Sequence, residues 1–426
     1  MQAQGVMGFD PPAVPTKTKK QWMMGCYFAV IWMFSVLLQL VLAGRFRGYL
    51  GDQMIFHAWM TQIDQFGIAN IYKTGQVDYP PVYLFMLDLY GKVANAVHIA
   101  VVPGGLWMKM PGIVLDACAM IAFFFATRGA QDGWRATVLT LFCLNPTILF
   151  DTAVWGQVDI LDGILSFLAV AVSMKKPGVA GGVFSLSLLS KFQSIVVFPV
   201  LAVQAVRDGR NRHTARTPLR LALGVALPLV VIFGLLAVQG ALGEMIDKAY
   251  IATTGEYPYV DMGAMNIWYY LFGTPPNLAD STTLFGGVTY KLIGLTLLFL
   301  ATLYVACYLW FHQSAGNQVV VLKAATALCF AFYMLPTEIH ERYVIMALIF
   351  SLAAALYDKR WMLLAVGLTL TSFCNLWSVC YNAVNPTSDM WMVYLNCVML
   401  IAMFVMMRKE VVWPHNWREC WRPPGV

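Results

Sequence analysis

The chain has 426 residues, of which 59% are hydrophobic and only 12% are charged, and its mean hydropathy is +0.65. The charged share is about half of what soluble domains carry, so the composition excludes a soluble globular protein. The net charge of +6 matters less than its placement, because the basic residues gather in a few segments between apolar stretches.

Three groups of basic residues flank apolar stretches, and the positive-inside rule makes them cytoplasmic. They are Lys17, Lys19 and Lys20; Arg207, Arg210, Arg212, Arg216 and Arg220; and Arg408, Lys409, Arg418 and Arg422. Such loops face membrane lipids, and we expect no nucleic-acid partner. The nine cysteines lie mostly in apolar runs without metal-ligand spacing, so we interpret them as small buried hydrophobes.

The N-terminal part begins with a polar tail, residues 1–20, and residues 21–426 are predicted to form one transmembrane domain. The first span runs from about Trp22 to Ala43, and we interpret it as an anchor rather than a cleaved signal peptide. Residues 45–81 are too polar for lipid and form a first external loop. Apolar residues at helical spacing over Met54–Phe66 predict an interfacial helix within it.

Residues 82–127 allow two interpretations. Val82–Val102 and Trp107–Thr127 have the composition of two spans, but two crossings would place Arg128 and Arg135 outside, against the charge bias. A partial span or a re-entrant hairpin would restore the expected side.

The remaining chain consists mainly of spans. Val179–Val206 is long for one span, and its polar break at 190–193 predicts two half-helices that meet at a turn lining a cavity. A second external loop covers about 243–288, and 408–426 is a cytoplasmic tail. The other predicted spans are 136–154, 160–174, 219–242, 290–310, 319–334, 344–357, 363–377 and 390–407. The predicted fold is an all-α bundle of about 11–14 transmembrane helices with two large external loops.

Polar segments interrupt the apolar chain at four places, each at the end of a span, where an ionisable residue is costly unless it has a function. Counting spans from the basic loops puts all four on the external face, which predicts one shared site there. The segments are Gly51-Asp52 with Asp78-Tyr79-Pro80-Pro81, Trp155-Gly156-Gln157-Val158-Asp159, Lys191-Phe192-Gln193, and His340-Glu341-Arg342-Tyr343.

Asp52 and Asp78 bracket the first external loop. Asp52 is either a general base for a hydroxyl acceptor or the N-cap of the interfacial helix. Asp78 and Tyr79 return beside the start of the loop, although the two prolines after them also indicate a plain helix start.

The second segment offers Gln157 and Asp159, with Asp162 one turn later. Amide and carboxylate groups beside an aromatic ring suit sugar hydroxyls, but a capped turn with an interfacial tryptophan would have the same sequence. Lys191 lies far from either end of an apolar segment, which favours pairing with a phosphate or a carboxylate, and Gln193 adds a donor.

The last segment places His340, Glu341 and Arg342 together where a span ends. A guanidinium matches phosphate geometry, and the alternative is an internal ion pair beside an interfacial Tyr343. Three residues of the second external loop are candidates to close over a substrate: Pro258, Asn266 and Trp268. The segment from Trp413 to Arg422 indicates a basic, aromatic interfacial anchor.

These motifs, taken in order and with Asn-x-Trp at 266–268, resemble the GT-C superfamily of integral-membrane glycosyltransferases. The similarity spans residues 50–345. It is nearest to bacterial proteins related to the second GPI-anchor mannosyltransferase and to the dolichyl-phosphate-glucose glucosyltransferases. It implies inverting transfer of one hexose, mannose or glucose, from a polyprenyl-phosphate monosaccharide to a hydroxyl of a lipid-linked or glycan acceptor, on the non-cytoplasmic face.

The resemblance also implies residue roles. Asp52 would deprotonate the acceptor hydroxyl. His340 and Arg342 would hold the donor phosphate, assisted by Lys191, and stabilise the charge that develops on it. The residues that would position sugar hydroxyls are Asp78, Gln157 and Asp159. Asp52 is followed by Gln53, where some metal-using members have a second acid, so we expect neither a metal nor another cofactor.

Three alternatives remain from the sequence. A secondary transporter or lipid-linked glycan flippase would use the break at Lys191 as its midplane site, but the chain has no internal repeat. A polymerase or ligase acting on a polyprenyl diphosphate usually needs larger external loops, and a non-catalytic partner subunit would use Asp52 only as a cap. The short loops and the final Pro-Pro-Gly-Val favour a bacterial inner membrane with a periplasmic site over the endoplasmic reticulum with a lumenal one.

Overall fold

The computed structural model describes residues 17–253, 255–269, 277–312 and 317–411. The predicted aromatic anchor and most of the predicted N-terminal tail lie outside these residues. Most of the described chain is helical, which confirms the predicted all-α fold. The one described sheet is a short antiparallel pair in the second loop, β1 (Thr283–Phe285) with β2 (Val288–Thr289).

In chain order the α-helices are α1 (Lys17–Arg45), α2 (Leu50–Phe66), α3 (Ile68–Thr74), α4 (Pro81–Ala96), α5 (Leu106–Ala126), α6 (Asp132–Cys143), α7 (Pro146–Leu149), α8 (Asp159–Ser173), α9 (Pro177–Leu188), α10 (Phe198–Asn211), α11 (Arg216–Val238), α12 (Leu242–Ile246), α13 (Tyr290–Phe311), α14 (Gln318–Met334), α15 (Ile345–Ala355), α16 (Trp361–Cys380) and α17 (Pro386–Lys409). The π-helical segments are η1 (Phe150–Trp155) and η3 (Asp247–Ile251), and η2 (Phe192–Val197) is a 3₁₀-helix.

Seven helical segments of the described chain are long and apolar enough to cross a membrane: α1, α5, the continuous stretch α6 to η1, α11, α13, α16 and α17. Three shorter apolar helices, α9, α14 and α15, pack among them. The chain is therefore a multi-pass membrane protein. Its centre is α14 and α15, because every residue of α15 and nearly all of α14 is buried.

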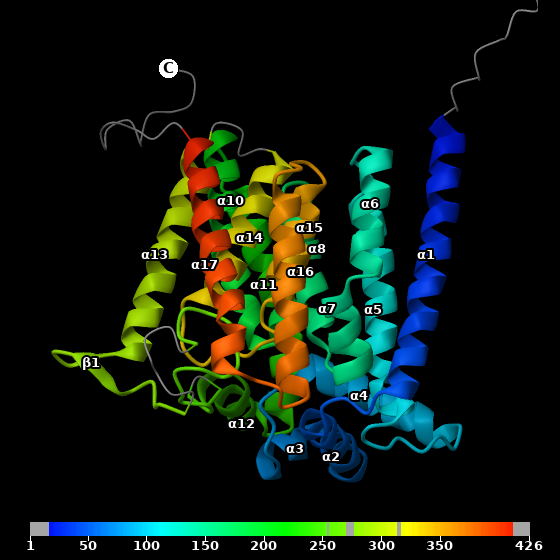
Figure 1. Ribbon diagram of the computed structural model, residues 1–426. Helices are drawn as coiled ribbons and strands as arrows, with labels where there is room; N and C mark the ends of the chain where they lie inside the picture. The colour runs from blue at the N-terminus through cyan, green and yellow to red at the C-terminus, as the bar shows by residue number, and fades with distance from the viewer. Residues whose placement is uncertain (1–16, 254, 270–276, 313–316, 412–426) are drawn as a thin grey trace, which may run out of the picture.

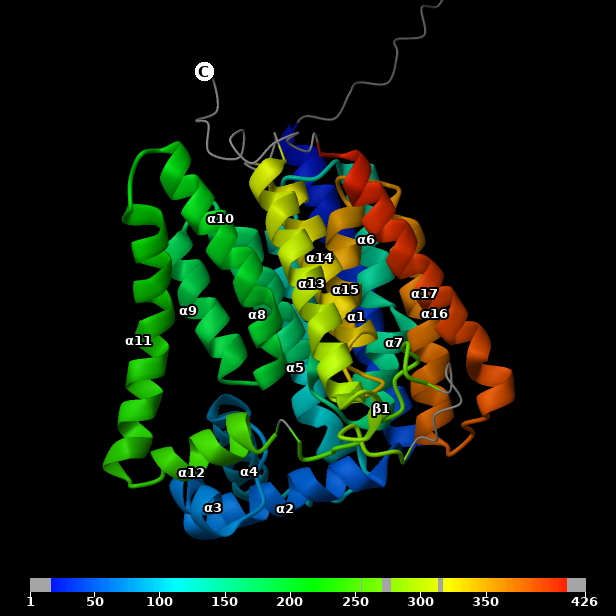
Figure 2. The same cartoon turned by 90° about the vertical axis from the view of Figure 1, so that its left-hand side faces the viewer.

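The bundle has two chemically different ends. Figures 1 and 2 show α2, α3, α4, α12 and the β-hairpin gathered at one end, and both ends of the described chain at the other. We call the first the loop end. The second is the basic end, because it holds the start of α1, the α10–α11 turn and the end of α17, which carry the described residues of the three basic groups; Arg418 and Arg422 lie outside the described residues. The charge pattern therefore separates the two ends as predicted.

The ambiguous region 82–127 contains one crossing. Figures 1 and 2 place α4 at the loop end beside α2, and only α5 runs through the bundle. The interpretation as two full spans is therefore wrong. Tyr83, Leu84 and Leu87 are apolar because they pack under α2, where Phe56 meets the Tyr83 ring, and not because they face lipid.

The break predicted at 190–193 is present, and it reverses the chain. α9 descends to the turn and α10 returns from it towards the basic end (Figure 2). With 12 residues, α9 rises only about 18 Å, against a hydrocarbon core of about 30 Å. The polar turn is thus recessed into the bundle, and the Val82 amide of α4 bonds to the Leu189 carbonyl beside it at 2.9 Å.

Candidate active site

Asp52 lies in the first turn of α2, and its carboxylate faces the Trp155 turn. Asp52 Oδ2 accepts hydrogen bonds from Trp155 Nε1, at 2.8 Å, and from Gln157 Nε2. The N-cap of α2 is Tyr49, and no side chain caps this helix. The interpretation of Asp52 as a helix cap is therefore wrong, because its carboxylate is held by another part of the chain.

The Trp155 turn has a conformation that needs glycine. Gly156 has a φ of +94°, and a Cβ atom there would lie 3.0 Å from Gln53 Cγ. The Asp151 carbonyl accepts the amides of Gly156 and Gln157, at 3.0 and 2.9 Å, which closes the turn at the end of η1. These bonds aim Gln157 at Asp52.

Gln53 ties the start of α2 to this turn. Its amide nitrogen donates to the Trp155 carbonyl at 2.8 Å and to the Arg47 carbonyl at 2.9 Å, and its oxygen accepts the Gly104 amide at 2.8 Å. The side chain is completely buried. From the sequence, Gln53 was notable only because it replaces a second acidic residue after Asp52. In the structure its hydrogen bonds hold the start of α2, and with it Asp52, against the Trp155 turn.

Arg342 lies among three carboxylates. Its guanidinium is 2.9 Å from Glu341 Oε1, and 3.6 Å from both Asp52 Oδ2 and Asp159 Oδ2. Arg342 Nε and Asp159 Oδ2 are both buried, and neither has a hydrogen-bond partner among the described residues. The two atoms face each other across 3.6 Å as a long ion pair without a hydrogen bond. A hydroxyl group could satisfy both, since it accepts and donates.

Lys191 projects from the recessed turn into the same cluster. Its ammonium pairs with Asp159 Oδ1 and lies over the rings of Tyr79 and Tyr343, 5.3 and 5.5 Å from their centroids. Gln193 donates to Asp162 Oδ2 at 3.0 Å and to Asp159 Oδ1 at 3.4 Å. The turn thus contributes a cation that aromatic faces and one carboxylate hold in place.

The His340 imidazole is neutral. Its burial, and the charges of Arg342 and Lys191, hold its pKa well below the usual value. The ring meets Tyr257 and Tyr343 edge-on, with centroids 5.2 and 5.3 Å away. A neutral imidazole can donate one hydrogen bond and carries no charge, so the cations of the site are Arg342 and Lys191.

Two further carboxyl groups border the site. Burial raises the pKa of Asp78, and the backbone bonds and the charges of Lys191 and Arg342 only partly oppose this. Burial, and then the charge of Asp78, raise the pKa of Glu256 to about 7. Glu256 comes from the second loop, which Lys248 fastens to the first loop by a hydrogen bond to the Gly75 carbonyl at 2.6 Å.

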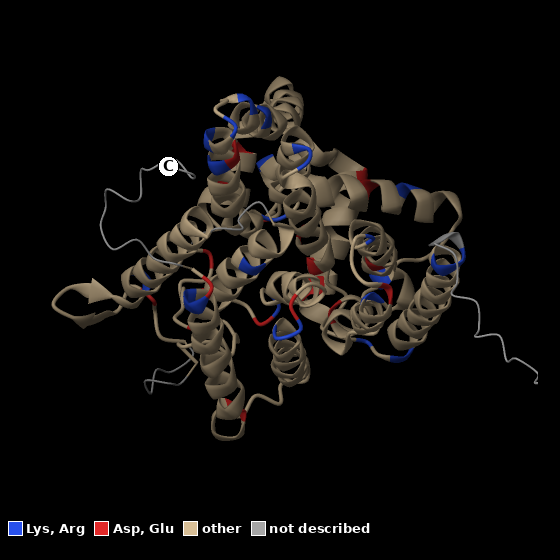
Figure 3. Ribbon diagram, turned by 90° about the horizontal axis from the view of Figure 1, so that it is seen from above, with Lys and Arg blue, Asp and Glu red and all other residues tan. Residues whose placement is uncertain are grey.

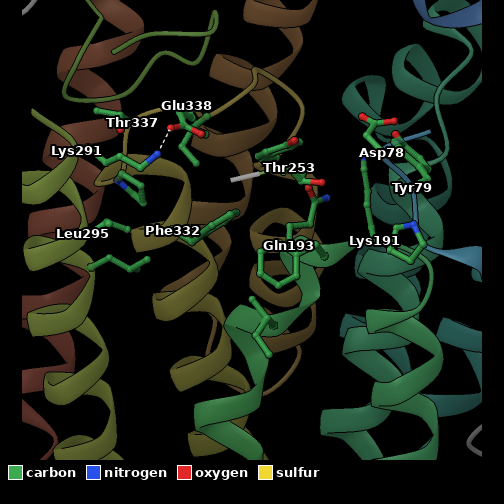
Figure 4. Close-up of a pocket in the computed structure, with 17 residues that line it drawn as sticks. Asp78, Tyr79, Lys191, Gln193, Thr253, Lys291, Leu295, Phe332, Thr337 and Glu338 are labelled. Carbon is green, nitrogen blue, oxygen red and sulfur yellow. Dashed lines mark hydrogen bonds and ion pairs between the residues drawn. The ribbon is translucent and has the colours of Figure 1, made fainter. Parts of the chain in front are cut away.

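A cavity of about 410 Å³ opens beside these groups (Figure 4). One wall carries Asp78, Tyr79, Lys191 and Gln193, and the opposite wall carries Thr337 and the Lys291–Glu338 ion pair. The cavity also has an apolar lining, which comes from η2, α13 and α14: Ile195, Leu295, Leu298 and Phe332. Ile195 and Leu295, which line the cavity, are also exposed on η2 and α13, and we infer that the cavity opens sideways, towards lipid.

A second, smaller cavity of about 60 Å³ continues from the first towards Arg342. Glu256, Tyr257 and His340 line it, together with residues shared with the larger cavity, such as Asp78 and Lys191. The lateral cavity therefore leads to the side chain that stands 3.6 Å from Asp52.

The structure brings together most of the side chains predicted for the site. They are Asp52, Asp78, Tyr79, Gln157, Asp159, Lys191, Gln193, His340, Glu341, Arg342 and Tyr343. For Asn266 and Trp268 the described side-chain hydrogen bonds are with each other and with the backbone at the end of α14. Asn266 is fully buried with its Oδ1 on the Trp268 amide, and Trp268 Nε1 donates to the Leu335 carbonyl at 2.8 Å. Both therefore support the chain that enters the His340 segment.

Asp151 is a buried acidic residue that was not among the predicted site residues. It lies in η1, and neither carboxylate oxygen has a hydrogen-bond partner in the described chain. The signal that could have revealed it is an acidic residue inside an otherwise apolar stretch, which is rare in membranes without a reason.

The described residues hold no group of three or more His, Cys, Asp or Glu side chains that could hold a metal ion. Comparison of the sequence with models of known protein families gives no match, and comparison with curated proteins gives none either.

Proposed function

We propose that the protein is a membrane glycosyltransferase. It transfers one hexose, mannose or glucose, from a polyprenyl-phosphate monosaccharide to a hydroxyl of a lipid-linked or glycan acceptor, and it acts on the non-cytoplasmic face. The observation that carries the proposal is the Asp52 carboxylate, aimed by Trp155 and Gln157, with the Arg342 guanidinium 3.6 Å away and the Lys191 ammonium on the neighbouring Asp159. A base next to an anion site is what displacement of a phosphate by a hydroxyl requires.

The base is Asp52. Two side-chain donors fix one of its oxygens, and the carboxylate is close to solvent, with 17% of the side chain exposed. An acceptor hydroxyl that reaches this carboxylate gives up its proton as its oxygen bonds to the anomeric carbon. Attack from the side opposite the phosphate inverts that carbon.

The leaving phosphate is held by Arg342 and Lys191, with His340 as a neutral donor. Both cations are already ordered by carboxylates, so they need little rearrangement when charge develops on the phosphate. Arg342 Nε and Asp159 Oδ2, an ion pair without a hydrogen bond, suit a sugar hydroxyl that would accept from the first and donate to the second. Tyr79, whose hydroxyl lies 3.5 Å from Gln157 Oε1, supplies an aromatic face.

The lateral cavity suits the lipid part of the donor. Its apolar lining between η2 and α13 faces the bilayer, and its polar wall carries Lys191 and Gln193. A polyprenyl phosphate combines the same two properties, an apolar chain and an anionic head. The clustering of these groups at the loop end favours transfer chemistry over transport, since a transporter needs access from both ends.

The test is transfer of radiolabelled sugar from a panel of polyprenyl-phosphate monosaccharides by the purified protein, with lipid extract as acceptor, with and without chelator. We expect chelator-resistant transfer from one donor. Asp52→Asn should lower it by about 10²–10⁴-fold, the usual contribution of a general base.

The matched control is Asp64→Asn, an exposed carboxylate on the same helix, which should transfer at the wild-type rate. Equal rates in the Asp52→Asn and Asp64→Asn proteins would reject Asp52 as the base. Absence of transfer and of donor hydrolysis with every donor would reject the glycosyltransferase.

A further inference from the structure

A second polar cavity lies at the basic end, across the bundle from the candidate active site. Its volume is about 490 Å³, and it lies between the start of α1, the end of α5 and the start of α6. The charged residues that line it are Lys20, Arg128, Asp132 and Arg135. Three cations therefore face one carboxylate.

Arg135 makes this cavity unusual, because its guanidinium is buried without an ion-pair partner. The residue is only 4% exposed. It donates to the Phe124 carbonyl and, at 3.4 Å, to Thr127 Oγ1, and its guanidinium lies over the Phe124 ring. Its described contacts include no carboxylate. A guanidinium has five N–H donors, so these two bonds leave three donors of a residue that lines the cavity without a described partner.

Two apolar side chains, Met24 and Phe124, also line the cavity, and we call them its apolar floor and the charged residues its rim. The neighbouring surface of α1 is apolar and outward-facing, since Trp22 is 70% exposed and only 22% of the apolar window of α1 is buried in the bundle. The cavity thus has a cationic rim, an apolar floor and a lipid-facing neighbour.

Its position matches the level of lipid headgroups. Figure 3 looks onto this end and shows basic positions at several helix ends, including the start of α1. Basic pockets between helices at the cytoplasmic side of a membrane suit anionic headgroups, because two or three cations surround one phosphate while the chains lie along the helices.

We propose that this cavity binds the phosphate of an anionic glycerophospholipid. Arg135 forms the inner contact with a phosphate oxygen, and Arg128 and Lys20 close over it from α5 and α1. The acyl chains lie against the exposed side of α1. The apolar floor and the lipid-facing side favour a lipid over free inorganic phosphate. The site is separate from the proposed glycosyl transfer and does not depend on it.

The experiment measures retention of phosphatidylglycerol by the detergent-purified full chain in native mass spectrometry, after incubation with equal parts of phosphatidylglycerol and phosphatidylcholine. The Lys20→Gln/Arg128→Gln protein is compared with Lys175→Gln/Arg220→Gln, which removes two exposed cations at the same end outside the cavity. Each cation near an anionic headgroup contributes roughly fivefold to binding, so we expect the cavity variant to bind about 25-fold more weakly than the control.

Both substituted residues are exposed, so the fold should persist, and thermal unfolding checks this. Arg135→Gln tests the inner contact directly and should lose at least as much binding. Equal retention by the cavity variant and its control overturns the proposal. Equal binding of phosphatidylcholine and phosphatidylglycerol by the wild type also overturns it. Release of the bound lipid by millimolar inorganic phosphate would show a site for the free anion and reject the lipid.

Discussion

Lys191 and Asp159 form the buried ion pair of the candidate site. Removing the charge of Lys191 should lower the free energy of unfolding by a different amount than removing the charge of Asp159. Their side chains are 9% and 1% exposed. Removing one partner of a buried pair costs about 3–5 kcal/mol, because the other charge stays buried and unpaired. In Lys191→Met, Asp159 keeps Arg342 at 3.6 Å, so we expect a loss of about 3 kcal/mol, at the lower end of that range.

Asp159→Asn should cost more. Lys191 then keeps the faces of Tyr79 and Tyr343 and the weaker attraction of Asp162, and it lies in a cluster with a second cation, Arg342. We expect a loss of about 5 kcal/mol. The double variant Lys191→Met/Asp159→Asn removes both charges, so its loss should fall at least about 2 kcal/mol short of the sum. Equilibrium unfolding in mixed detergent micelles measures all three.

Activity separates a structural pair from a phosphate-binding lysine. If Lys191 holds the donor phosphate, the double variant regains stability but not transfer, and its KM for the donor stays raised. A double variant with wild-type transfer would show that Lys191 only neutralises Asp159. Additive losses of stability would refute the reasoning about the pair itself.

Three other changes test the surroundings of this pair. Trp155→Phe deletes one donor to Asp52 and should lower the rate of transfer by about 10–100-fold, the effect of one hydrogen bond to a charged group. Trp268→Phe deletes an indole hydrogen bond of equal length outside the site and should leave the rate unchanged. Gly156→Ala should destabilise the protein by about 1–3 kcal/mol and abolish transfer. Its control is Gly67→Ala, which is also at positive φ but has open space around it and should cost only about 1 kcal/mol. Thermal unfolding measures both losses. Glu256 is neutral below its pKa of about 7 and anionic above it. Lowering the pH from about 8 to about 6 should therefore lower the KM for an anionic donor, and Glu256→Gln should remove this pH dependence. An unchanged pH profile in the variant would contradict this role of Glu256.

The sequence predicts most of the bundle because apolar length and basic loops are strong signals. The spans around α1, α5, α11, α13, α16 and α17 agree with helices long enough to cross a membrane. α4 is the exception. Its residues pack under α2 in a cluster at the loop end, and a buried helix has the same composition as a short span.

The candidate site was predictable as a set of residues, but not as a geometry. Ionisable residues at helix ends pointed to Asp52, Lys191 and Arg342. The partners of Asp52 were not predictable, because Trp155 lies 103 positions away and only the fold brings its indole to the carboxylate. The indole bond of Trp268 to the Leu335 carbonyl was not predictable either, since an aromatic residue in a loop has the same sequence signal whether it meets a substrate or a backbone carbonyl.

The sideways opening between Ile195 and Leu295 has a consequence for kinetics. A ligand that enters there travels within the plane of the bilayer, so its effective concentration is its mole fraction among lipids and not its amount per volume of buffer. Diluting it with inert lipid, at constant total ligand and protein, should then slow any reaction it undergoes. Adding buffer should change nothing.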